Sequence, residues 1–188
     1  MPRQVDHSIP ETPLSPFPIT TEFCDVVAGF GRGSSELGIP TANVPIEQLP
    51  DTIKDLKLGV YFGFVRLRPN TTTHAAKSAT GPAAVRDVDY NYGSYLTTEQ
   101  LQPLPVVLSI GLNPFYHNKS KTVELHILTK FQHDFYGAQV KFSILGFIRP
   151  ELDYTTKEAL IKDIQIDIQI AEANLARMSY SKYVDELS

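Results

Sequence analysis

Hydrophobic positions along the chain form short runs of the kind that build β-strands. Each run is rich in β-branched and aromatic residues and is bounded by glycine, proline or polar residues, as strands usually are. We therefore predict strands over residues 23–28, 58–67, 104–112, 122–129 and 139–149. The run 58–67 contains two glycines, Gly59 and Gly63, which indicate tight bends or close packing against another strand.

The run 122–129 alternates most regularly between apolar and polar positions. Side chains of a strand point to opposite faces at successive residues. One face therefore carries Val123, Leu125 and Ile127, and the other carries Glu124, His126 and Leu128. We expect the first face to be buried in a core.

The last part of the chain changes to a helical period. Apolar residues recur every three or four positions between residues 155 and 178, and Thr155 and Glu158 have the spacing of a capping box. The apolar stripe consists of Leu160, Ile164, Ile168, Ala171 and Leu175. Strands followed by a single long helix, without alternation of strands and helices, favour a closed or Greek-key antiparallel barrel with a C-terminal helix packed on it.

Two segments stand outside this pattern. Residues 1–20 contain five prolines and few large apolar residues, and we expect an N-terminal tail there. Residues 69–103 differ in composition from their surroundings, and we expect an insertion that joins two paired strands. The remaining residues, 21–188, are of a length that suits one domain with a sizeable core.

Charge and cysteine content narrow the possible functions. The net charge of −4 and a pI near 5.7 provide no general attraction to nucleic acid or to an anionic membrane. A single cysteine, Cys24, excludes an internal disulfide and a cysteine-based zinc cluster. The first residues lack the apolar segment of a secretory signal, and no apolar run is long enough to span a bilayer. We expect a monomeric cytoplasmic protein, with attachment to an organelle left open.

A glycine-rich stretch, residues 29–43, is the first candidate for chemistry. Its sequence GFGRGSSELGIPTAN has four glycines within ten residues and ends on Thr41 and Asn43. Such a loop can hold phosphate oxygens through backbone N–H groups, and a hydroxyl and an amide oxygen are hard ligands that suit Mg²⁺. By spacing alone a plain turn is the commoner structure, and the stretch is not a P-loop.

Two charged residues on strands are the next candidates. Glu124 lies on the polar face of its strand, where it is either an exposed carboxylate or a base that accepts a proton from a hydroxyl nucleophile. Arg149 ends a strand, where it either pairs with Glu151 at the surface or binds an anion or a ring with its planar guanidinium. The residues alone favour the first alternative for Glu124 and leave both open for Arg149.

Several longer motifs identify a family resemblance. The chain resembles the eukaryotic-type, and specifically the fungal, riboflavin kinases (flavokinases). The matching blocks occur in the family's order and read GFGRGxxxLGIPTAN (29–43), GVYFG (59–63), SIGLNPFY (109–116), VELHI (123–127), FxxDFYG (131–137) and GFIRPE (146–151). The combination of the first block with the downstream E-x-H is specific, and it favours the catalytic alternatives above.

The resemblance implies a mainly β fold, a six-stranded antiparallel Greek-key barrel with a C-terminal helix, and the conversion of riboflavin and ATP to FMN and ADP. It implies that Glu124 activates the ribityl 5′-hydroxyl of riboflavin and that Arg149 and Glu151 contact the flavin. It implies that Thr41 and Asn43 bind Mg²⁺, with Zn²⁺ or Mn²⁺ as alternatives. The nucleotide would be bound by Gly29, Gly31, Ser35, Thr41, Asn43, Ile127 and Tyr136.

These implications require that Thr41, Asn43 and Glu124 converge on one cleft of the barrel. Bacterial relatives fuse the domain to an adenylyltransferase, for which this chain has no room, so we expect FMN formation without FAD synthesis. Two rival functions stay open. One is a flavin-binding barrel without kinase activity, and the other is an OB-like barrel that binds nucleic acid, against which the acidic balance argues.

Overall fold

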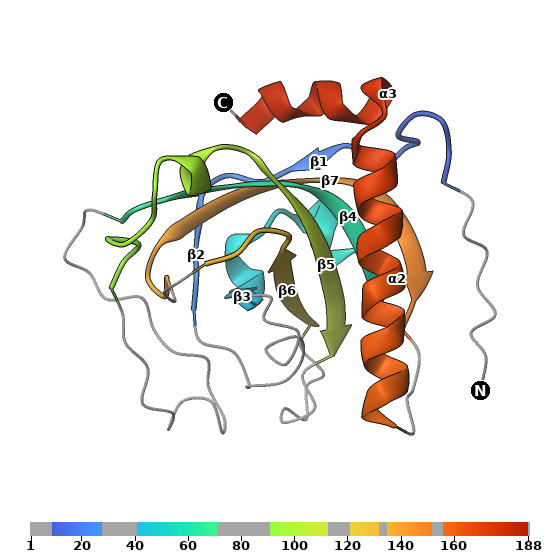
Figure 1. Cartoon of the computed structure of the whole chain (residues 1–188), viewed down its shortest axis with the longest axis horizontal. Coiled ribbons are helices and arrows are strands. Elements are labelled where there is room, and N and C mark those ends of the chain that lie inside the picture. The colour runs from blue at the N-terminus through green and yellow to red at the C-terminus, as the bar shows by residue number, and fades with distance from the viewer. Residues whose placement is uncertain are drawn as a thin grey trace.

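The computed structural model describes residues 9–27, 41–70, 91–112, 121–131, 135–151 and 156–187. Within these residues one antiparallel sheet of seven strands dominates the molecule (Figure 1). The strands are β1 (Ile19–Thr20), β2 (Cys24–Asp25), β3 (Thr41–Val44), β4 (Gly59–Arg68), β5 (Leu104–Leu112), β6 (Lys121–Ile127) and β7 (Gln139–Pro150). The helices are α1 (Asp51–Lys54), α2 (Lys157–Leu175) and α3 (Met178–Ser181), with 3₁₀ turns at Ile46–Gln48, Glu99–Leu101 and Lys182–Leu187.

The strand order is β1-β7-β4-β5-β6-β3, and β2 also pairs with β7. The sheet curls around an interior without forming a barrel closed by continuous ladders (Figure 1). Among the described residues a single bridge crosses the gap, where the backbone N–H of Val27 donates to the carbonyl oxygen of Asn43 at 2.9 Å. The predicted fold class, mainly antiparallel β with a C-terminal helix, is confirmed, and its barrel shape is approximate.

The predicted strand over residues 23–28 is shorter in the structure because the chain changes its partner there. Cys24 and Asp25 pair with β7, and the N–H of Val26 still donates to Ala138. One residue later, Val27 bonds to Asn43 of β3 instead. Because this segment pairs first with β7 and then with β3, its hydrogen bonds to each strand are few and the strand is short.

The concave inner face of the sheet holds the larger of two cores. Its members include Val65, Leu108, Leu125, Phe142 and Ile144, all with no measurable exposure. The long β4–β7 pair closes one side of this core, and it contains a register shift between Phe62 and Gly63. A Cβ on Gly63 would lie 1.8 Å from the carbonyl oxygen of Ser143, so the two strands can approach this closely only at a glycine.

The second core lies between the convex outer face of the sheet and the C-terminal helices. Helix α2 crosses β4 and β5, and α3 with the final 3₁₀ turn follows it (Figure 1). Ala171 and Leu175 of the predicted stripe are buried there against the sheet, and Ile168 packs beside them. The helix spans Lys157–Leu175, so it begins two residues later and ends three residues earlier than the predicted range of 155–178. Its N-cap is Thr156, whose hydroxyl accepts the N–H of Ala159 at 3.1 Å.

Part of the predicted N-terminal tail lies against the domain. Ile19 and Thr20 form β1 on the free edge of β7, with Ile19 buried in the inner core. The hydroxyl of the buried Tyr180 donates to the carbonyl oxygen of Pro10 at 2.6 Å. Of the predicted insertion, residues 71–90 lie outside the described residues, and the strands that it joins, β4 and β5, are paired as expected. No helix in the described ranges is long and apolar enough to cross a membrane.

Candidate active site

The pairing of β3 with β6 brings together residues that lie eighty positions apart in the sequence. Asn43 lies directly opposite Glu124, and Thr41 lies opposite His126. The alternate pair, Ala42 and Leu125, is fully buried in the inner core. Because opposite residues of an antiparallel pair share a face, Thr41, Asn43, Glu124 and His126 all lie on the outer face. The register therefore places Thr41, Asn43 and Glu124 on one face, as convergence on one cleft requires, but of these three only Glu124 lines the cavity described next.

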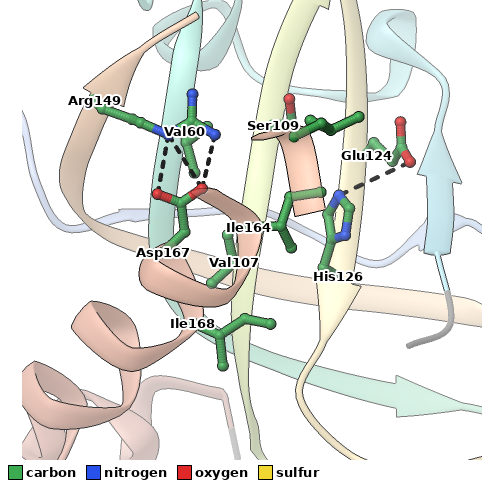
Figure 2. Close-up of a pocket in the computed structure, with 10 residues that line it drawn as sticks. Val60, Val107, Ser109, Glu124, His126, Arg149, Ile164, Asp167 and Ile168 are labelled. Carbon is green, nitrogen blue, oxygen red and sulfur yellow. Dashed lines mark hydrogen bonds and ion pairs between the residues drawn. The ribbon is translucent and has the colours of Figure 1, made fainter. Parts of the chain in front are cut away.

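A cavity of about 130 Å³ opens beside these residues, between the outer face of the sheet and α2 (Figure 2). Its apolar walls come from β4, β5 and α2, and are formed by Val60, Val107, Leu160, Ile164 and Ile168. Its polar groups come from β5, β6, β7 and α2, and are Ser109, Glu124, His126, Arg149 and Asp167. A carboxylate, a guanidinium and apolar walls thus meet in one concave site, the usual arrangement of a small-molecule site.

Glu124 keeps partial access to solvent. Its side chain is 25% exposed, and one carboxylate oxygen lies 3.8 Å from Nε2 of His126 (Figure 2). That imidazole is buried, and desolvation lowers the pKa of His126 to about 4. His126 is therefore neutral at pH 7, so the contact is not an ion pair there.

Arg149 is a buried residue and not the surface residue that its position at a strand end suggested. It is 4% exposed and pairs with Asp167 of α2, which is 2% exposed. Nε donates to Oδ1 at 3.0 Å and Nη2 donates to Oδ2 at 2.8 Å, while Nη1 reaches the carbonyl oxygen of Pro150 at 3.3 Å. This two-point geometry fixes the plane of the guanidinium.

The sequence reasoning overlooked Asp167. It stands three residues after Ile164 and four before Ala171, so it falls on the buried stripe of α2. An acidic residue inside an apolar helical stripe was the available signal, because a buried carboxylate requires a partner.

Comparison with known proteins places this chain in a family. The model of the family described as "Flavokinase: Riboflavin kinase" matches residues 18–175 of this chain. The chain belongs to the riboflavin kinase family. It is 58% identical to the riboflavin kinase of Kluyveromyces lactis, over the whole of both chains. It is 57% identical to that of Saccharomyces cerevisiae, over 98% of this chain and 85% of that protein. The predicted resemblance to fungal riboflavin kinases is confirmed.

A solved structure shares the fold. The crystal structure of riboflavin kinase from Trypanosoma brucei superposes with a TM-score of 0.60 at 24% identity, and the match covers 91% of this chain and 88% of that one. At this level of identity, the likeness concerns the arrangement of the strands and helix.

Other residues that the riboflavin kinase resemblance implies lie apart from the cavity. The Ile127 side chain is fully buried in the inner core, on the opposite face of β6 from Glu124. Tyr136 packs against that same core. Glu151 follows β7 and is exposed, and its carboxylate lies over Gly111 of β5, where an added Cβ would be 2.6 Å from Oε1. Gly29, Gly31 and Ser35 lie outside the described residues.

The donor set around Glu124 suits a hard divalent cation. Thr41 and Asn43 are half-buried and offer a hydroxyl and an amide oxygen on the same face as the Glu124 carboxylate. Oxygen donors of this kind match Mg²⁺, which retains water and binds phosphates at the same time. The described residues contain no group of three or more His, Cys, Asp or Glu side chains that would form a protein-only metal centre.

Proposed function

We propose that the outer-face cavity and the adjoining β3–β6 face form the site at which the γ-phosphate of ATP is transferred to the ribityl 5′-hydroxyl of riboflavin. Membership of the family gives the overall reaction, which is the ATP-dependent phosphorylation of riboflavin to FMN. The observation that supports the location is the register of β3 and β6, which sets Asn43 beside Glu124 on the face that leads to the cavity.

Glu124 is the proposed general base. The riboflavin hydroxyl oxygen forms a bond to the γ-phosphorus, the bond from that phosphorus to the bridging oxygen of ADP breaks, and the hydroxyl proton passes to the Glu124 carboxylate. Its position on the rim of an apolar cavity, with a side chain 25% exposed, lets a substrate hydroxyl reach it. His126 beside it is neutral at pH 7, so the 3.8 Å contact between the two side chains is not an ion pair.

Thr41 and Asn43 are the proposed holders of a divalent cation. Their hard oxygen donors favour Mg²⁺ over Zn²⁺ and suit Mn²⁺ as well, and Mg²⁺ is the proposed ion. When bound, the cation offsets negative charge on the ATP phosphates. Nucleotide binding by Gly29, Gly31, Ser35, Ile127 and Tyr136 stays a prediction. For Ile127 a side-chain contact with the nucleotide is not supported, because this side chain is fully buried in the inner core.

The cavity walls are the proposed site of the flavin end of riboflavin. The aliphatic side chains of Val60, Val107 and Ile164 provide apolar surface, and the guanidinium of Arg149 provides hydrogen-bond donors next to it. Glu151 is exposed and does not line the cavity, so a contact with the flavin stays a prediction from the family resemblance.

The test is an incubation of the protein with riboflavin, ATP and Mg²⁺, followed by chromatographic separation of FMN from FAD. We expect FMN and ADP in equal amounts and no FAD. Riboflavin binding without FMN formation would instead support a flavin carrier. Replacing Mg²⁺ by Mn²⁺ or Zn²⁺ in the same assay ranks the cations.

We further propose that the protein acts as a cytoplasmic monomer. The acidic net charge of −4 supports the absence of general attraction to nucleic acid and anionic membranes. Light scattering coupled to gel filtration would measure the mass directly. A mass twice that of the chain, or sedimentation of the protein with a membrane fraction, would contradict this part.

A further inference from the structure

The ion pair of Arg149 and Asp167 joins the last strand of the sheet to helix α2 in a place where charge is costly. Both side chains are almost fully buried, and the isoleucines at positions 164 and 168 lie on the same side of α2 (Figure 2). Transfer of two charges from water to such a site costs several kcal/mol, which their attraction offsets only with good geometry. A well-packed apolar pair would stabilise the contact between helix and sheet as well or better. Stability alone therefore gives no reason for this pair.

The position of the pair gives another reason. Arg149 and Asp167 both line the cavity that contains Glu124, with the pair on one side and Glu124 and His126 on the other (Figure 2). The carboxylate holds the guanidinium along its Nε–Nη2 edge at 3.0 and 2.8 Å. An unbranched arginine side chain has many rotamers, and a fixed partner removes most of them before a ligand arrives.

We propose that Asp167 is a positioning residue for riboflavin. It fixes the plane of the Arg149 guanidinium in the cavity wall and balances its charge. The affinity for the flavin substrate therefore depends on the position of helix α2, which carries Asp167. This rests on the proposed function. Because the carboxylate compensates the arginine, the wall presents oriented hydrogen-bond donors without a net charge, which suits an uncharged ring system rather than a phosphate. ATP binding, which we place on the β3 side, is expected to be independent of the pair.

The test compares Asp167→Asn with a matched control, Asp163→Asn. Asp163 lies one turn earlier on α2 and is 6% exposed, but it does not line the cavity. We expect Asp167→Asn to raise the KM for riboflavin by about 10- to 100-fold, as the loss of a supporting hydrogen-bond partner commonly does. The KM for ATP should change by less than about twofold, because the reoriented group does not contact the nucleotide. Asp163→Asn should leave both KM values near those of the wild type.

Two further variants separate positioning from stability. Asp167→Glu keeps the carboxylate and should recover part of the lost riboflavin affinity. The double variant Arg149→Met with Asp167→Leu removes both charges and should remain folded, because apolar replacement of a buried pair is commonly tolerated. Its riboflavin KM should nevertheless be raised as in Asp167→Asn.

The proposal is overturned if the double variant binds riboflavin with native KM, or if Asp167→Asn and Asp163→Asn change the two KM values alike. It is also overturned if the KM for ATP rises as much as that for riboflavin. Wild-type protein that makes no FMN would instead contradict the proposed function, so the two failures are distinguishable. Thermal unfolding of every variant sets an assay temperature at which all of them are folded.

Discussion

The two faces of strand β6 have different surroundings, one in the inner core and the other at the cavity. On the inner face, Val123, Leu125 and Ile127 are at most 1% exposed and belong to the core of the curled sheet. On the outer face, Glu124 and His126 border a cavity under α2. Adjacent residues of one strand thus face the core and the proposed site separately, because the two-residue period of a strand sends them to opposite sides.

The outer face itself is divided along the length of α2. Toward α3 it is a second apolar core, in which Phe62 and Leu145 meet Leu175 and Tyr180. Toward the start of α2 the packing opens into the cavity and the buried residues include Asp163 and Asp167. The apolar half holds the helix in place, and the polar half is where the helix can contribute to a site.

The largest expected effect comes from Glu124→Gln on the outer face. The amide keeps the size of the side chain but cannot accept the hydroxyl proton, so kcat should fall by about 10²- to 10⁴-fold. The free energy of unfolding should change little, because the side chain is partly exposed and outside both cores. Steady-state FMN formation and thermal unfolding measure the two effects. A variant that turns over ATP and riboflavin at the native rate would refute the role of Glu124.

The neighbouring substitution Leu125→Ala should have the opposite profile. Leu125 is fully buried on the inner face, and truncation to alanine costs about 2–5 kcal/mol of unfolding free energy through lost burial and the resulting cavity. Denaturant unfolding measures this loss. At a temperature where the variant is folded, kcat should stay near that of the wild type. A loss of kcat as large as that of Glu124→Gln would show that the two faces are not separable.

The buried Cys24 thiol of the inner core should make the folded protein less stable at high pH. Burial raises the pKa of the Cys24 thiol to about 11, and the neighbouring charges of Asp25 and Glu22 act in the same direction, partly opposed by a hydrogen bond with Thr21. The unfolded chain loses this proton at lower pH than the folded one, so stability is full below pH 9 and falls as pH rises from 9 toward 11. We expect a loss of about 1–2 kcal/mol by pH 10.5. Unfolding of Cys24→Ala across the same range should show a flatter profile, and equal profiles would contradict the assignment.

The smallest expected effect concerns the start of α2, beside the cavity. Thr156→Ala removes the side-chain acceptor of the Ala159 N–H and should cost about 1 kcal/mol. Thr156→Ser, which keeps the hydroxyl, is the matched control. Thermal unfolding detects the difference. If the alanine variant is as stable as the serine variant, the first turn of α2 does not depend on this cap.

The sequence predicted some elements of the fold correctly and missed others. The alternation of residues 122–129 assigned both faces of β6 correctly, because burial on one side of a strand leaves a two-residue pattern. The apolar stripe of the last helix likewise identified its buried side. The strand Ile19–Thr20 was assigned to the tail, because two residues among prolines carry no period and only the free edge of β7 makes them a strand.

The sequence by itself determined which residues face the core, where the long strands and helix lie, and, through motifs in a specific order, the family. Local periodicity and residue chemistry depend only on residues that are close together in the sequence, so the sequence alone is enough to identify them. The tertiary structure alone decided that Asn43 lies opposite Glu124, and that Asp167 of α2 pairs with Arg149. Strand register and helix docking depend on contacts between segments far apart in the chain, and no local pattern records which of several possible partners the packed molecule brings within 3 Å.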